Sequence, residues 1–258
     1  MKRSLVVLTL CAVALPVLAQ DASEDWDLVR DPAKRSILAF TTFDVGLSVA
    51  FRCNNGSLNT VIAGLPASSE ERRTLQLQFR DRPAYDSGWT TTTNRTVVVG
   101  DYPAMLARDF REGGALKLTV PGGAPDGRNL RFEVELPSSN GAIDEVLTSC
   151  GRPLVDPRDA SREALTDTGL PTGLAWARAP RPIFPATNYA QGFVVSSCLT
   201  TPDGRLEDCV VEMEHPHDGG FGEAALRATR SARLRNLDQT DQPLPVRLVS
   251  FRTRFLMR

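Results

Sequence analysis

The stretch from Phe193 to Met213, FVVSSCLTTPDGRLEDCVVEM, decides the fold of the last third of the chain. Two runs of β-favouring residues flank the triplet Pro-Asp-Gly at 202–204. Proline fixes φ at the first position of a turn and glycine accepts a positive φ, so the triplet predicts a tight hairpin. The missing N–H of proline favours a type I turn with a glycine bulge. We therefore expect two antiparallel strands, over residues 193–199 and 206–213.

Two further segments complete this unit. Residues 221–235 are predicted to form a helix, because a stripe of small apolar side chains recurs on one face and allows close packing on a sheet. Residues 248–257 alternate in character and predict a final strand, one face of which carries Ser250, Arg252 and Arg254. The order β, β, α, β over residues 181–258 indicates a small α+β domain.

Residues 24–152 are predicted to form a separate domain that is mainly antiparallel β. Its strands are short runs that alternate with a period near two, separated by Gly, Asn, Asp and Pro: 36–43, 46–53, 73–79, 95–99, 116–120 and 130–136. Strands at this spacing suggest a sandwich-like arrangement. A helix is expected at the end of the domain, where one apolar face contains Ile143, Val146, Leu147 and Cys150. The chain as a whole is therefore expected to be α+β.

Four cysteines lie beyond the N-terminal segment and allow three pairings: Cys53, Cys150, Cys198 and Cys209. Cys53 ends a predicted strand and Cys150 lies on a predicted helix of the same domain, so these two are expected to pair. Cys198 lies within one residue of facing Cys209 across the predicted hairpin, which puts a cross-strand disulfide within reach. An even number of cysteines in an exported chain is typical of an oxidising compartment.

The segment 153–180 is expected to be a linker between the two domains. It carries four prolines among charged and small residues, which favours an irregular chain: Pro153, Pro157, Pro171 and Pro180. Fully extended, such a segment reaches roughly 90 to 100 Å.

Residues 1–19 have the composition of a secretory signal peptide. Lys2 and Arg3 precede an apolar run over 4–18, and Ala19 ends the small-residue site that a signal peptidase reads. The apolar run is shorter than the roughly 20 residues that a membrane span needs. We therefore expect a periplasmic protein exported by a cleaved signal peptide. The alternative is a retained inner-membrane anchor, with the rest of the chain facing the periplasm.

Residues 181–258 resemble the C-terminal domain of the TonB family. The matching motifs follow one another in the order that the family has: Phe184-Pro185-Ala186, Gly192 to Val195, Pro202 to Leu206, Phe221 to Leu226 and Val246 to Phe255. Each motif is short, and the match depends on their order and spacing. Phe184 stands where the family usually has Tyr, and the aromatic-Pro pair that follows the family's helix is absent.

The resemblance implies a domain that binds a partner. Family members pair by strand addition with a short peptide of an outer-membrane transporter and transmit force from an inner-membrane motor. The final strand would offer its unpaired edge to an extended peptide. The residues expected to contact it are Phe184, Pro185, Leu248, Ser250, Arg252 and Arg254. The two arginines would favour an acidic partner; the alternative interpretation is that they only keep an exposed edge soluble.

Residues 24–150 resemble, more weakly, the periplasmic VasI-like proteins associated with type VI secretion, through Trp26, Trp89 and the segments that end in Cys53 and Cys150. The leading expectation is a periplasmic protein that binds a partner protein or extended peptide and is linked to TonB-dependent transport. The alternatives are an anchored TonB-type energy transducer, which needs the N-terminal anchor, and a secretion-associated accessory protein.

No motif for catalysis or metal binding stands out, so we expect neither an enzyme nor a cofactor. The patterns G-x-S-x-G, H-E-x-x-H and the phosphate loop do not occur. His215 and His217 precede Asp218 and a pair of glycines, where a solvated loop is favoured over a metal site. An enzyme centred on this loop is the remaining alternative. A net charge of −1 gives no indication of nucleic-acid binding.

Overall fold

The computed structural model describes residues 25–162, 165, 169–238 and 242–257. The predicted signal peptide, residues 1–19, lies outside the described residues. Within the described residues, no helix has the length and apolar character needed to cross a membrane. The structure is mostly antiparallel β with a few helices, which confirms the α+β class.

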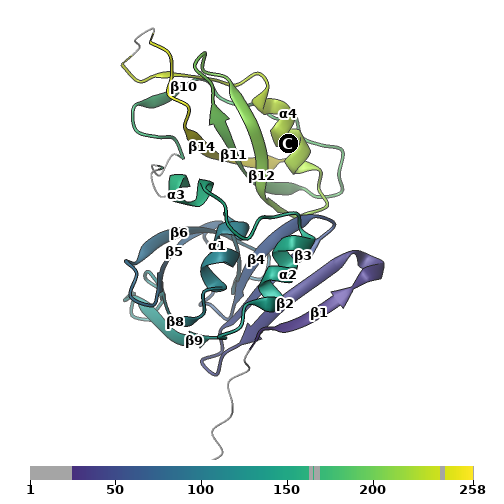
Figure 1. Cartoon of the computed structure of the whole chain (residues 1–258), viewed down its shortest axis with the longest axis vertical. Coiled ribbons are helices and arrows are strands. Elements are labelled where there is room, and N and C mark those ends of the chain that lie inside the picture. The colour runs from purple at the N-terminus through teal and green to yellow at the C-terminus, as the bar shows by residue number, and fades with distance from the viewer. Residues whose placement is uncertain (1–24, 163–164, 166–168, 239–241, 258) are drawn as a thin grey trace, which may run out of the picture.

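The first domain is built on one nine-stranded antiparallel sheet in the order β1-β2-β3-β4-β7-β6-β5-β8-β9. Its strands are β1 (Asp27–Asp31), β2 (Ser36–Thr42), β3 (Ser48–Asn54), β4 (Ser57–Ala63), β5 (Arg72–Phe79), β6 (Tyr85–Thr91), β7 (Val97–Gly100), β8 (Gly114–Val120) and β9 (Leu130–Leu136). A short 3-10 helix, Pro32–Lys34, joins the first two strands. The sandwich predicted from the sequence would need two separate sheets. Here β4 pairs with β7 and β5 pairs with β8, so hydrogen bonds run through a single curled sheet (Figure 1).

Two helices provide the packing that a second sheet would have given. Helix α1 (Pro103–Phe110) packs on β4 and β7, and α2 (Gly141–Ser149) packs on β2 and β3. Phe110 of α1 lies at the centre of the core, with its ring 5.4 Å from that of Phe51 and 5.0 Å from that of Phe79. A disulfide between Cys53 and Cys150 joins β3 to the end of α2, which confirms the predicted pairing.

The second unit has a three-stranded sheet in the order β12-β11-β14, with helix α4 on one face (Figure 1). Its elements are β11 (Gln191–Thr200), β12 (Leu206–His215), α4 (Phe221–Thr229) and β14 (Leu248–Leu256). The predicted order β, β, α, β is therefore present. Helix α4 is shorter than expected, because the chain leaves the helix after Thr229 and forms another strand, β13 (Arg233–Asn236).

The segment predicted to be a linker differs from that expectation. It contains a short helix, α3 (Arg158–Arg162), and a strand, β10 (Leu174–Arg178), which pairs with β13. Apolar side chains explain the difference: Trp176 lies opposite Leu234 in this pair and packs edge-on against Phe251 at 5.5 Å. Leu170 is buried in the same cluster. Residues 170–178 therefore belong to the core of the second unit.

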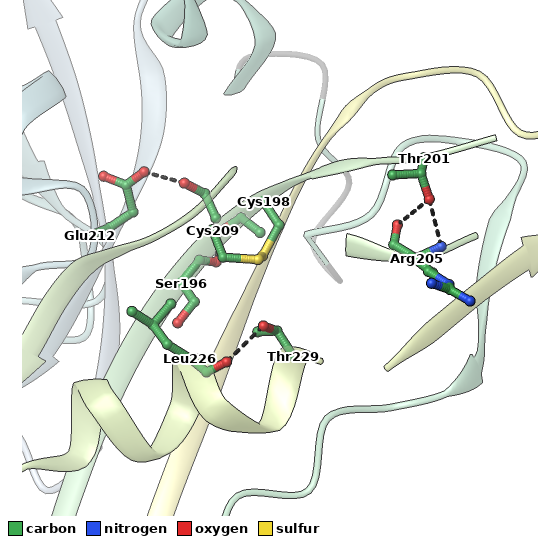
Figure 2. The surroundings of a disulfide bond; sticks show 10 residues. Ser196, Cys198, Thr201, Arg205, Cys209, Glu212, Leu226 and Thr229 are labelled. Atoms are coloured by element: carbon green, nitrogen blue, oxygen red, sulfur yellow. Dashed lines mark hydrogen bonds between the residues drawn. A yellow bond between two sulfur atoms is a disulfide. The ribbon is translucent and has the colours of Figure 1, made fainter. Parts of the chain in front are cut away.

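The hairpin between β11 and β12 forms as predicted. Gly204 has a φ of +78°, and its N–H donates to the carbonyl of Thr201. A Cβ at this position would lie 2.3 Å from the carbonyl oxygen of Leu234, so the turn requires glycine. Cys198 and Cys209 form the predicted cross-strand disulfide, with Cα atoms 4.1 Å apart (Figure 2).

Helix α4 is capped by a side chain from the strand that precedes it. Gly220 at its N-cap has no side chain to accept a hydrogen bond, and Glu214 of β12 takes that role by accepting the N–H of Phe221 at 2.9 Å. Burial raises the pKa of the Glu214 carboxyl, and the helix N–H groups oppose that shift.

Glu214→Ala is expected to lower the free energy of unfolding by about 1 kcal/mol, because it removes the only cap of a buried helix end that the described side chains provide. Urea unfolding followed by circular dichroism measures the change. Glu223→Ala is the matched control, since this exposed carboxylate lies in the first turn of the same helix. Equal effects of the two substitutions would contradict the capping role.

The sheet of the second unit lies with its other face on the first domain (Figure 1). Phe193, Val195 and Met213 of this face form one buried cluster with Val99 of the first domain. Tyr102 packs at the margin of the same cluster. The two domains thus share an apolar core, so the strands of the small sheet are fixed relative to the first domain.

Candidate partner-binding site

Strand β14 forms one border of the small sheet, and part of that border is open. β14 pairs with β11 along one side only. On the other side, the N–H of Ser250 donates to the carbonyl of Gly169 at 2.7 Å. Because backbone groups alternate in direction along a strand, the N–H groups of Arg252 and Arg254 also point outward. Within the residues that the structure describes, no backbone carbonyl accepts a hydrogen bond from either of them.

Two of the residues predicted to contact a partner are buried within this sheet. Leu248 is 5% exposed and packs in the interior. Ser250 is 1% exposed; its hydroxyl accepts from Tyr102 Oη at 2.7 Å and donates to the carbonyl of Ser196 at 3.1 Å. Their side chains therefore serve packing, and only the backbone of Ser250 reaches the border.

Phe184 and Pro185 lie on the opposite face, beside α4. The ring of Phe184 packs edge-on against Phe221 at 5.6 Å and against Phe255 at 6.3 Å. Pro185 approaches the turn at Gly220 that starts the helix. The structure thus separates this pair from the outward border of β14, and the pair covers the core under the helix.

Arg252 and Arg254 both reach the first domain, which sequence reasoning did not foresee. Arg252 Nη1 lies 3.3 Å from Asp101 Oδ1, and its guanidinium stacks over the ring of Phe193 at 4.9 Å. Arg254 forms an ion pair with Glu71. Both arginines therefore join the second unit to the first domain, in addition to any contact with a partner.

Asp101 is the centre of this charged cluster. Its side chain is 4% exposed, and its second oxygen accepts from Arg72 Nε at 3.1 Å. Thr90 adds a weaker contact from its hydroxyl at 3.4 Å. One buried carboxylate thus faces two guanidinium groups. Burial lowers the pKa of Arg252, the like charge of Arg72 lowers it further, and the carboxylate of Asp101 opposes both. The sequence gives no signal that distinguishes Asp101 from the other carboxylates expected in loops.

A cavity of about 350 Å³ lies along this border of β14, between the two domains. The first domain contributes three lining residues, Arg72, Asp101 and Tyr102. The remaining lining residues come from the second unit and the segment before it: Gly169, Trp176, Val195, Ser250, Phe251 and Arg252. The cavity therefore adjoins β14 and is lined by both charged and aromatic side chains.

A buried ionic network fixes α3 between the two domains. Arg162 Nη2 lies 2.5 Å from Glu212 Oε1, and both side chains are less than 5% exposed. Glu212 also accepts from the hydroxyl of Ser197, on the strand that carries Cys198 (Figure 2). The guanidinium of Arg162 stacks over the ring of Tyr102 at 5.5 Å. Asp159 of α3 pairs with Arg162 and with Arg108 of the first domain.

The two histidines lie at the other end of the domain junction. His217 Nε2 lies 3.1 Å from Asn54 Nδ2 of β3. Burial lowers the pKa of His215, and the positive charge of Arg52 and the neighbouring His217 lower it further. Within the described residues, no three His, Cys, Asp or Glu side chains are placed to hold a metal ion.

Acidification is expected to weaken the fold through His215. Its pKa is lowered in the folded state, so the unfolded chain binds the proton more readily. The stability gained by keeping His215 neutral is complete above the ordinary histidine pKa of about 6.5, and it is lost progressively as the pH falls from that value toward the lowered pKa of the folded state. Thermal unfolding at pH 7.5 and 5.5 should therefore show a larger fall in Tm for the native chain than for His215→Gln. Identical falls would contradict this assignment.

The chain was compared with protein families, curated proteins and solved structures. No protein-family model and no curated protein matches the chain. Among solved structures, the chain is similar to invasion associated protein B from Bartonella henselae, at 17% sequence identity and a TM-score of 0.36. The match covers 50% of this chain and 95% of that protein.

Proposed function

We propose that this chain is an exported protein that binds an extended segment of a partner protein at the open border of β14. The observation that carries the proposal is the backbone of that border: Ser250 donates its N–H to Gly169, while the outward N–H groups of Arg252 and Arg254 meet no backbone carbonyl among the described residues. A sheet edge of this kind is suited to strand addition. The proposed role is binding, without catalysis.

The proposed location is the periplasm. Two disulfides, one in each domain, are consistent with export to an oxidising compartment. In that compartment, the resemblance to the TonB C-terminal domain makes outer-membrane transporters the first class of partner to test. Members of that family pair with a short transporter peptide, and strand addition requires the bound segment to be extended.

Titration with synthetic peptides copied from such segments tests the proposal. For a peptide that binds, two N-methylated versions are compared, one methylated at even backbone positions and the other at odd positions. In strand addition, every second peptide N–H points at β14, so one version should bind at least about tenfold more weakly and the other like the parent. Failure of every peptide to bind, or equal binding of both methylated versions, would contradict strand addition.

A further inference from the structure

We propose that the first domain forms one wall of the binding groove, and that Arg72 and Arg252 together bind an acidic side chain of the extended partner segment. This inference rests on the proposed function and gives the chemistry of the partner. It differs from binding by the second unit alone, because Arg72 belongs to β5 of the first domain.

The first argument is the balance of charge at the cavity. The charged groups that act on Arg252 are Asp101, Glu71, Arg72 and Arg254. With Arg252 itself, the cluster holds three guanidinium groups and two carboxylates, which leaves one positive charge in excess. The buried network around Glu212 has the opposite excess once Asp156, which also pairs with Arg108, is counted: two guanidinium groups face three carboxylates, none of which lines the cavity. An anionic group bound here would balance the charge on the side that a ligand can reach.

The second argument is that Arg72 has donors to spare. Its side chain is 51% exposed, and among the described residues its only hydrogen bond runs from Nε to Asp101. The terminal nitrogens of a guanidinium form a planar fork that suits a carboxylate. Arg252, held by Asp101 and by the ring of Phe193, provides a second donor group beside the same cavity.

The third argument is the direction of side chains in an added strand. A residue placed opposite Arg252 points its side chain to the same face of the sheet as Arg252 does, which is the face toward the first domain. The residues on either side of it point to the other face, where Trp176 and Phe251 pack together at 5.5 Å. The preferred partner motif is therefore one acidic residue between two apolar residues.

Fluorescence anisotropy with the full chain tests this motif. The probes are the labelled peptide Val-Thr-Val-Glu-Val-Thr-Val and versions with Gln or Lys at the centre. The Glu peptide should bind about tenfold more tightly than the Gln peptide, as expected for one charge-assisted contact, and the Lys peptide most weakly. Equal binding of the Glu and Gln peptides would overturn the inference, and this comparison needs no variant protein.

Variants locate the contact. Arg72→Gln should weaken binding of the Glu peptide more than binding of the Gln peptide, and so reduce the preference for Glu, while Arg252 retains the rest of it. Arg73→Gln is the matched control: the neighbouring arginine donates to the carbonyl of Pro66 and lines a different cavity, so the preference should persist. Equal loss in both variants would indicate general charge attraction and would contradict the site. If none of the three peptides binds while transporter peptides do, the acidic motif is wrong and the strand-addition site stands; if no peptide of either kind binds, the proposed function itself fails.

Discussion

Arg162→Met is expected to lower the free energy of unfolding by about 3 to 5 kcal/mol, because it leaves Glu212 charged and buried without its cation. The side chain of Glu212 is 3% exposed, and its remaining partner is the hydroxyl of Ser197. The substitution also removes the ion pair that joins α3 to β12 of the second unit, whereas Asp159 keeps its pair with Arg108. Urea unfolding followed by circular dichroism and by tryptophan fluorescence measures the loss.

A double variant separates the buried charge from general damage to packing. Removing both partners with Arg162→Met and Glu212→Gln should cost less than Arg162→Met alone, since no isolated charge then remains in the interior. Arg158→Gln is the control on the same short helix and should change the free energy of unfolding by less than about 0.5 kcal/mol. A double variant less stable than Arg162→Met would contradict this account of the network.

Loss of the Cys53–Cys150 disulfide is expected to have the second large effect. The bridge closes a loop with a sequence separation of 97, for which the chain-entropy model gives about 4 to 5 kcal/mol. The Cys198–Cys209 bridge closes a separation of 11, for which the same model gives about 3 kcal/mol. The paired alanine variants should therefore differ in stability in that order, in urea unfolding under non-reducing conditions. A larger loss for the short loop would contradict the entropic argument.

The sequence predicts those parts of the fold that depend on local pattern. The turn at 202–204 needs a proline and then a glycine with positive φ, and both are visible in the sequence. The two disulfides follow from strands and a helix recognised by their periodicity. The final strand is equally clear, because its alternation continues over nine residues, Leu248–Leu256.

Elements that depend on distant partners were not predicted. Residues 233–236 continue a helical pattern, but they pair instead with 174–178, which lie more than fifty residues earlier. Strand β4 contains Asn59 and Thr60, and β6 contains Asp86 and Gly88, so their polar and small residues hide the alternation. Helix α1 begins at a proline and has only eight residues, which are too few to display a helical period clearly.

For the candidate site, strand β14 was predicted from the sequence, but the residues of the first domain that surround it were not. The edge position of β14 was expected from the family resemblance and is present in the sheet order, and the placement of the arginines on one face follows from alternation. The partners of those arginines, Asp101 and Glu71, lie on loops of another domain, and no local pattern connects them to β14. The contribution of the first domain to the site therefore depends on the docking of the domains, which is a property of the tertiary structure.

Amide hydrogen exchange, measured residue by residue by nuclear magnetic resonance with and without the Val-Thr-Val-Glu-Val-Thr-Val peptide, tests the binding border most directly. The account predicts that the N–H groups of Arg252 and Arg254 exchange rapidly in the free protein and become protected when the peptide binds. The N–H groups of Phe251 and Thr253, already paired with β11, should change little. Peptide binding without new protection at Arg252 and Arg254 would contradict the claim that β14 receives the partner.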